Sequence, residues 1–365
     1  MIALTHSLLG VDPLFDGGLL WTPILIVVLK VLVVFVIGLV ATMLMVWFER
    51  KAIAGMQNRI GPNKAGPFGL LQTLADGIKL FFKEDLLPVK ADKFVFRFAP
   101  YLSFVPAFLA FAVIPVGGDF RGDTGGIVTW FGHATRVQLA DPPVGFLFAL
   151  AISSIAVYGI MLAGWSSGSK YPLLGSVRAS AQMISYEAAL ALSFGAVVLV
   201  AGTMSTSGIV NVQETLGDWH VVATGFVPFV IFLMAATAEL NRPPFDLVEA
   251  EQELVGGFNT EYSSIRFALF FLAEFMNTIT MAAVIVTLFF GGYNLPWMND
   301  TGFVFPGGHV VALSHGWVVV LQLLTFLGKI FLLCSFQILV RWTLPRFRWD
   351  QLLRFAWKFL LPLAI

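Results

Sequence analysis

The sequence predicts an all-α, polytopic membrane protein with about eight transmembrane helices and one amphipathic helix on the membrane surface. Of its 365 residues, 58% are hydrophobic and only 12% are charged. Mean hydropathy is +0.85, which is too apolar for a soluble globular protein. No internal repeat, low-complexity tract or soluble domain is evident, so residues 1–365 are expected to form a single membrane domain.

Apolar runs long enough to cross a bilayer recur along the chain, since a transmembrane helix needs roughly 20 mostly apolar residues. No basic segment or small-residue cleavage site precedes the first run, which therefore indicates a retained span. The last run is short, is interrupted by Pro362, and carries Arg354 and Lys358, which are expected to reach the membrane interface. The predicted spans are 21–48, 96–117, 144–165, 179–201, 221–240, 263–290, 316–341 and 348–365.

Lys and Arg residues gather in the loops that follow the odd-numbered spans, whereas the opposite loops carry chiefly Arg121 and Arg136. By the positive-inside rule, the N-terminus is expected outside and the odd loops in the cytoplasm or matrix. The formal net charge is +0, so no overall electrostatic field would attract nucleic acid.

The first cytoplasmic loop, residues 49–95, begins with Glu49-Arg50-Lys51 and contains two Gly-Pro pairs, 61–62 and 66–67. These pairs impose a defined, non-helical path. Apolar and polar residues then alternate over 68–83 in a pattern typical of a helix lying along the membrane surface. Two interpretations stay open, a basic cap at the membrane interface and a polar vestibule where a ligand headgroup meets a partner protein.

The loop 241–262 is rich in acidic residues. If Asp246 to Glu253 is helical, Asp246, Glu249 and Glu253 share one face. Their mutual repulsion would raise some of their pKa values and couple their titrations, so that the cluster could hold and release protons near neutral pH. A solvated acidic loop explains the same spacing equally well.

Three further charges lie within predicted spans. Glu187 and Glu274 each lie about eight residues inside, where an ionised carboxylate costs roughly 2.5–3.5 kcal/mol. Both are expected to face the bundle interior, water or a cation, and Lys329 and Arg178 are candidate partners; a purely structural hydrogen bond is the alternative. Lys30 is expected to reach the interface or to pair with an unidentified group.

The chain offers little that could bind a redox centre or a metal. Cys334 is the only cysteine, whereas an iron-sulfur cluster needs several thiolates, and no two histidines lie deep on facing spans as haem ligation requires. No nucleotide-binding loop, catalytic triad or metal-ligand spacing is present. We therefore expect no metal site and no cofactor bound by this chain.

Long motifs, in order, resemble the quinone-chamber membrane subunit (the H subunit) of proton-translocating NADH:quinone oxidoreductase, respiratory complex I. Trp349 stands where the family usually has Tyr, and the external loop 117–143 is longer than usual. The matching segments cover most of the chain and are 49–72, 75–84, 169–178, 182–187, 238–262, 273–275 and 341–352.

The resemblance implies eight helices around a chamber that admits ubiquinone or menaquinone as substrate. It also implies partner subunits: other membrane subunits, and a peripheral arm that holds NADH, FMN and iron-sulfur clusters. The location would be a bacterial inner membrane, or the mitochondrial inner membrane if the chain is organellar. The residues that match the family's proton-coupling channel are Glu187, Glu239, Glu249, Glu253, Glu261 and Glu274, and those near the chamber or its portal are Glu49, Arg50, Arg59, Asp76 and Lys79.

Two other functions compete with this interpretation. The homologous membrane subunit of a membrane-bound hydrogenase would co-purify with nickel-iron subunits rather than flavin-containing ones. A free-standing ion transporter would use the same intramembrane carboxylates and would move ions when reconstituted alone. The polar first and third cytoplasmic loops favour a docked subunit over the transporter.

Overall fold

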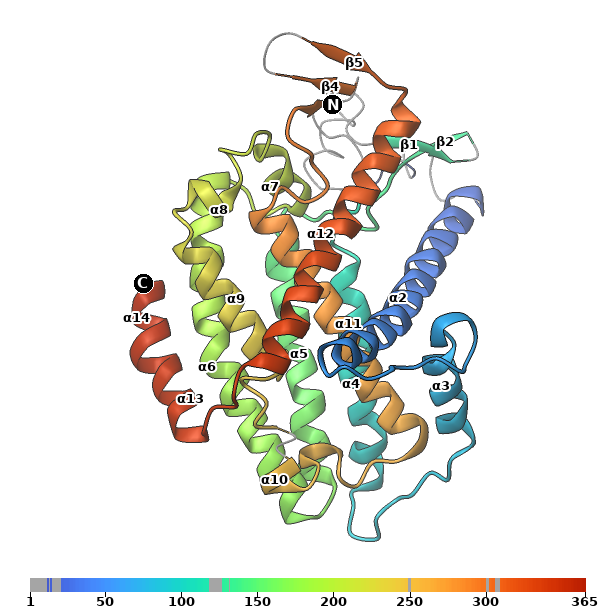
Figure 1. Ribbon diagram of the computed structural model, residues 1–365, viewed down its shortest axis with the longest axis vertical. Coiled ribbons are helices and arrows are strands. Elements are labelled where there is room, and N and C mark those ends of the chain that lie inside the picture. Colours follow the sequence, from blue (N-terminus) through green and yellow to red (C-terminus); the bar gives the residue numbers. More distant parts are fainter. Residues whose placement is uncertain are drawn as a thin grey trace.

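The computed structural model describes residues 12, 14, 21–117, 127–130, 132–248, 251–299, 302–305 and 309–365. In this part of the chain, six helices are long and apolar enough to cross a membrane (Figure 1). Their presence confirms a polytopic helical membrane protein. They are α2 (Trp21–Met56), α4 (Lys93–Phe111), α5 (Gly145–Ser166), α6 (Lys170–Ala201), α11 (Ser264–Phe289) and α12 (His315–Thr343).

The fifth and eighth predicted spans are broken. The fifth is divided between α8 (His220–Ala223) and α9 (Val227–Glu239), because Gly225 and Phe226 have φ values of 79° and 66°, outside the helical region. The eighth consists of α13 (Trp349–Phe355), a π-helical turn (Ala356–Leu360) and α14 (Leu361–Ala364). Neither matches the six long helices in length, so a total of eight spans stays a prediction.

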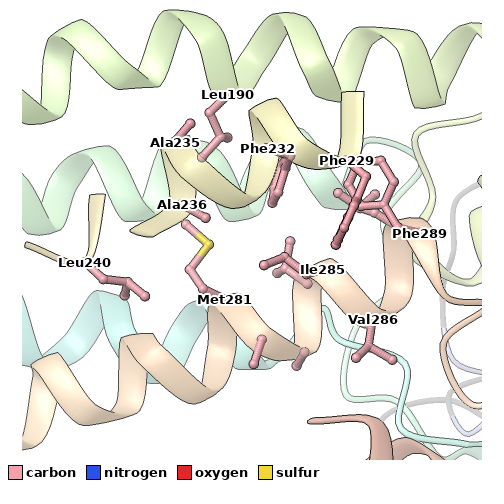
Figure 2. Close-up of a cluster of buried hydrophobic side chains, with 14 of the residues drawn as sticks. Leu190, Phe229, Phe232, Ala235, Ala236, Leu240, Met281, Ile285, Val286 and Phe289 are labelled. Atoms are coloured by element: carbon pink, nitrogen blue, oxygen red, sulfur yellow. The ribbon is translucent and has the colours of Figure 1, made fainter. Parts of the chain in front are cut away.

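Helix α11 forms the centre of the bundle. Of its most apolar 18-residue window, 72% is buried, against 17% for α2. Figure 2 shows Met281, Ile285 and Phe289 of α11 facing Phe232 and Ala236 of α9. Because α2 leaves most of its apolar surface uncovered, lipid is expected to be its main solvent.

A short surface helix, α3 (Gln72–Phe82), lies within the first loop as expected, and none of its residues is buried. The 3₁₀ turn Pro67–Gly69 precedes it. Gly69 has φ of 78°, and a Cβ atom there would lie 2.4 Å from the Pro62 carbonyl. The loop therefore needs glycine at position 69.

Two small antiparallel sheets lie outside the helical bundle, at the end opposite α10 (Glu251–Leu254; Figure 1). Sequence reasoning did not anticipate them. One pairs β1 (Ile127–Trp130) with β2 (His133–Arg136), in the register Val128 to Thr135. The other has the order β3 (Met298–Asn299), β4 (Gly302–Val304), β5 (Val310–Ala312). The helix α7 (Thr206–Val212) lies at the same end.

The acidic loop is not the continuous helix that was considered. Residues 246–248 are non-helical, and the helical turn α10 covers only Glu251–Leu254. Asp246 and Glu253 therefore do not share a helical face. Glu249 lies outside the described residues. Asp246, Leu247 and Val248 are buried, so this part of the loop packs on the bundle rather than extending into solvent.

Candidate functional site

A cavity of about 600 Å³ opens between the C-terminal end of α2, the first loop, α11 and the C-terminal end of α12. Four of the residues expected near a chamber line it, namely Glu49, Arg50, Arg59 and Asp76. Lys79 does not line it. The other residues that line the cavity are Val46, Ile53, Gln57, Gly61, Pro62, Gln72, Phe271, Phe275, Arg341 and Trp342.

Glu49 is the buried anion of this cavity, with only 5% of its surface exposed. Arg341 Nη1 lies 2.6 Å from Glu49 Oε1, and Trp342 Nε1 donates to the same oxygen at 3.4 Å. Arg242 Nη1 donates to Glu49 Oε2 at 3.4 Å. Charge-assisted hydrogen bonds of this kind are stronger than those between neutral groups, and the contact with Arg341 holds α2 against α12.

Arg50 and Asp76 join α2 to the surface helix α3. Arg50 Nη1 donates to Asp76 Oδ2 at 2.7 Å, and Lys79 Nζ lies 3.7 Å from Asp76 Oδ1. Partial burial acts to raise the pKa of Asp76, but the hydrogen bond and charge of Arg50, together with Lys79, lower it below its usual range. Arg59 Nε donates to Gln57 Oε1 at 2.7 Å.

Arg242 links this cavity to a second one. Its guanidinium is almost fully buried, and besides Glu49 it pairs with Glu274, with 3.1 Å between Arg242 Nη2 and Glu274 Oε1. It also lies over the Phe275 ring, 4.4 Å from the centroid. Glu49 lines the first cavity and Glu274 lines the second, so one cation spans the wall between them.

The second cavity, termed here the carboxylate cavity, has a volume of about 90 Å³ between α4, α5, α6, α9 and α11. One water needs roughly 10–15 Å³ of such space, so several waters fit. Glu239 and Glu274 line it, and Glu239 Oε2 is buried with no hydrogen-bond partner among the described residues. Other polar lining residues are Ser103, Ser153, Asn241, Asn259, Asn277 and Thr280.

Three more of the predicted carboxylates, Glu187, Glu253 and Glu261, line neither cavity. Glu187 accepts a hydrogen bond from Ser154, the neighbour of the cavity-lining Ser153, and interacts electrostatically with Glu239. Glu253 is exposed and pairs with Arg178 at 2.6 Å. Glu261 is half-buried in the loop before α11 and lines neither cavity.

The model of the NADH dehydrogenase family matches residues 29–365 of this chain. The chain belongs to this family. It is 52% identical to the NADH-quinone oxidoreductase H subunit of Frankia alni over 344 residues, which are 94% of this chain and 71% of the relative. It is 48% identical to the H subunit of Streptomyces avermitilis over 340 residues, 93% of this chain and 71% of the relative. As a member of the family, it is a multi-pass membrane subunit of NADH-quinone oxidoreductase.

The structure corrects the ion pairs that were expected for Lys329 and Arg178. Lys329 does not pair with Glu187 or Glu274; its Nζ donates to the backbone oxygens of Phe290, Gly292 and Asn294 at 2.7–2.9 Å. Lys329 therefore caps the C-terminal end of α11. Arg178 pairs with Glu253 rather than with Glu187.

Lys30, for which no partner was evident, is 7% exposed and pairs with Asp12 at 3.0 Å. It also donates to Thr135 Oγ1 at 3.0 Å and to the Gln138 carbonyl at 3.3 Å. Lys30 is therefore buried in a polar cluster, and the group with which it pairs is Asp12.

Sequence reasoning missed Arg242 and Arg341 as site residues. Arg242 counted only as a cytoplasmic charge after the fifth predicted span, and Arg341 was only the last residue of the predicted span 316–341. Arg341 lies in the last turn of α12 and Arg242 lies three residues after the end of α9, but nothing in the local pattern shows that either side chain points back into the bundle. Among the described residues, no group of three or more His, Cys, Asp or Glu side chains could hold a metal ion.

Proposed function

We propose that this chain forms the quinone chamber of NADH-quinone oxidoreductase and couples quinone reduction to proton translocation through buried carboxylates. The observation that carries the proposal is the bridge Glu49–Arg242–Glu274. This bridge gives a ligand in the larger cavity a direct electrostatic connection to carboxylates inside the membrane.

The size and lining of the first cavity suit a quinone headgroup. Small-molecule sites typically measure about 300–1,000 Å³ and combine apolar walls with a few polar groups. Phe271, Phe275 and Trp342 supply aromatic surface, while Arg50 and Arg59 supply donors for quinone oxygens. The exposed Phe81 and Phe82 of α3 offer an apolar approach from the bilayer.

Reduction of a quinone in this cavity takes up electrons and protons beside Glu49. A charge change there alters how Arg242 divides its attraction between Glu49 and Glu274, because attraction between charges is strong where water is excluded. A weaker hold on Glu274 changes the charge balance in the carboxylate cavity, which Glu274 lines. Water in the carboxylate cavity then connects Glu274 to Glu239, and Glu187 follows through its electrostatic contact with Glu239.

The proposal places the chain in a bacterial inner membrane with the N-terminus outside. Electrons reach the quinone from NADH through FMN and iron-sulfur clusters held by peripheral-arm subunits. The other membrane subunits receive the charge shift. The relatives are named as H subunits of NADH-quinone oxidoreductase, which supports this assignment over a hydrogenase subunit or a free-standing transporter.

Arg242→Lys in the assembled complex tests the bridge. Lysine keeps the charge but lacks the fork that reaches two carboxylates, so we expect quinone reduction and proton pumping to fall together by at least about tenfold, or 1.4 kcal/mol. Reduction of a soluble acceptor by NADH should not change, which shows that the peripheral arm is intact. Arg354→Lys, at an exposed site, is the matched control. Normal coupled activity in Arg242→Lys would refute the proposal.

The carboxylates are tested separately. Replacing Glu187 or Glu249 with Gln should preserve assembly but lower coupled quinone reduction, because glutamine cannot carry the proton. Proton pumping and quinone reduction at the original rates in both variants would remove these residues from the mechanism.

A further inference from the structure

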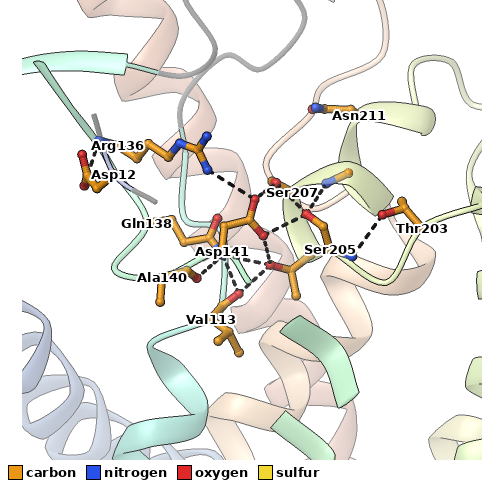
Figure 3. Close-up of polar contacts among 12 residues, drawn as sticks. Asp12, Val113, Arg136, Gln138, Ala140, Asp141, Thr203, Ser205, Ser207 and Asn211 are labelled. Carbon is orange, nitrogen blue, oxygen red and sulfur yellow. Dashed lines mark hydrogen bonds and ion pairs between the residues drawn. The ribbon is translucent and has the colours of Figure 1, made fainter. Parts of the chain in front are cut away.

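A buried polar cluster lies at the strand-bearing end of the bundle, away from the quinone chamber. Its centre is Asp141, 8% exposed, which accepts hydrogen bonds from Ser205 at 2.8 Å and from Ser207 (Figure 3). Arg136 Nη1 lies 3.7 Å from Asp141 Oδ2. We call this set the outer cluster; it comprises Asp12, Lys30, Thr135, Arg136, Gln138, Asp141, Ser205, Thr206 and Ser207.

The outer cluster lies directly beyond one end of the carboxylate cavity. Gln138 Nε2 and Thr206 Oγ1 both donate to the Val113 carbonyl at 2.7 Å. Val113 is three residues from Ala110, which lines the cavity. The outer cluster therefore begins only three residues beyond the apolar end of the cavity.

Phe146 occupies the space between them. It lines the carboxylate cavity, while its own backbone N donates to the Met204 carbonyl at 3.2 Å. Its neighbour Gly145 lies against Thr206 of the outer cluster. The Phe146 ring stacks on Phe194 with centroids 3.8 Å apart.

Phe232 closes the barrier from α9, with its centroid 6.3 Å from that of Phe146. The rings of Phe146, Phe194 and Phe232 are all buried. Water and protons have no polar partner among them, and an unpaired charge between them would be very costly.

Two unpartnered atoms indicate that the outer cluster also binds water. Gln138 is 2% exposed, and its Oε1 accepts no hydrogen bond from the described residues. Arg136 Nε is likewise buried without an acceptor there. Buried polar atoms of this kind are typically satisfied by ordered water.

We propose that the chain contains a closed proton route across the membrane, in which Phe146 is the seal and Asp141 is the terminal proton acceptor on the outer side. This inference rests on the proposed function, because the carboxylate cavity supplies the inner end of the route. With the seal in place, protons in the carboxylate cavity cannot cross to the outer cluster. The energy of quinone reduction is then transmitted to the neighbouring membrane subunits.

Passive proton permeability tests the seal. The purified complex is reconstituted into liposomes that enclose a pH-sensitive dye, a potassium gradient with valinomycin drives proton movement, and NADH is omitted. Phe146→Ala should equilibrate pH several-fold faster than the wild type. Phe148→Ala, on the same helix but 41% exposed, is the matched control and should stay as tight as the wild type.

Two further variants make the test decisive. Phe232→Ala opens the barrier from α9 and should also leak. It tests the seal independently if the Phe146→Ala complex assembles poorly. Adding Asp141→Asn to the leaking variant should restore most of the tightness, because asparagine keeps an acceptor for Ser205 but cannot take up a proton.

Liposomes with Phe146→Ala and Phe232→Ala that are both as tight as the wild type would overturn the seal. A leak that Asp141→Asn leaves unchanged would overturn the role of Asp141. Since no turnover is involved, failure of the quinone-coupling proposal would appear in Arg242→Lys and leave these permeability results readable on their own.

Discussion

Arg346 Nη2 lies 2.6 Å from Asp246 Oδ2, although the two residues are 100 positions apart. This pair ties the start of the acidic loop to the connection between α12 and α13, where the Phe347 backbone N also donates to the Pro244 carbonyl at 3.0 Å. Arg178, in α6, pairs with Glu253 further along the loop. Arginine side chains thus hold the acidic loop at two points.

Arg346→Gln should loosen this loop. Hydrogen bonds to charged groups contribute about 1.5–3 kcal/mol, so we expect faster amide hydrogen exchange over residues 240–248 and a lower rate of quinone reduction. Lys83→Gln, an exposed cation without an ion pair among the described side chains, should leave both unchanged. Exchange at the wild-type rate in Arg346→Gln would show that the loop is held by its apolar contacts alone.

Lys30 and Asp12 should behave as a coupled pair. Lys30→Met leaves the Asp12 carboxylate largely buried without its cation, and breaking a buried ion pair costs about 3–5 kcal/mol. Asp12→Asn in the same chain should recover part of that loss, because the uncompensated charge is then gone. A double-mutant cycle from thermal unfolding of the detergent-solubilised complex measures the coupling. Additive losses would mean that the pair contributes nothing beyond its separate contacts.

Hydropathy was sufficient to predict the long helices, because lipid requires about 20 apolar residues per span. It failed where the backbone is interrupted, as at Gly225 and Phe226. The helix α6 also begins at Lys170, nine residues before the predicted span, because Pro172, Ser176 and Arg178 interrupt the apolar residues of its first turns.

Part of the lining of the first cavity was predictable from the sequence, but the contacts among its residues were not. Motifs in the first loop indicated Glu49, Arg50 and Asp76, and these residues do line one cavity. Nothing local indicated that Arg242 joins Glu49 to Glu274, because the three residues come from separate segments brought together only by tertiary packing. The same holds for Lys30, whose partner Asp12 lies in a region without any periodic pattern.

The contact between α2 and α3 should be insensitive to pH in the physiological range. The pKa of Asp76 is lowered in the folded protein, so its stabilising effect is present above its unfolded pKa and is lost only as pH falls through the lowered value. Asp76→Asn should therefore speed hydrogen exchange in α3 by a similar factor at all pH values from about 5 to 8. A difference that disappears within that range would contradict the assignment.

Tyr262 should stabilise the end of the acidic loop mainly through its ring. The side chain is 6% exposed, its ring stacks on Phe96 at 4.1 Å, and its hydroxyl donates to the Phe96 carbonyl at 3.1 Å. Burial raises the pKa of the Tyr262 phenol. The stabilising effect of the neutral phenol therefore persists until pH rises past about 10, the pKa of tyrosine in the unfolded chain.

Tyr262→Phe should cost about 0.5–1.5 kcal/mol for the lost hydrogen bond, whereas Tyr262→Ala should cost about 3–5 kcal/mol because it also removes the stacked ring. Thermal unfolding of the complex at neutral pH should rank wild type above Tyr262→Phe, and Tyr262→Phe above Tyr262→Ala. Tyr171→Phe, at a site 40% exposed, should unfold like the wild type. If Tyr262→Phe were as unstable as Tyr262→Ala, the hydroxyl rather than the ring would hold the loop, because only the hydroxyl differs between tyrosine and phenylalanine.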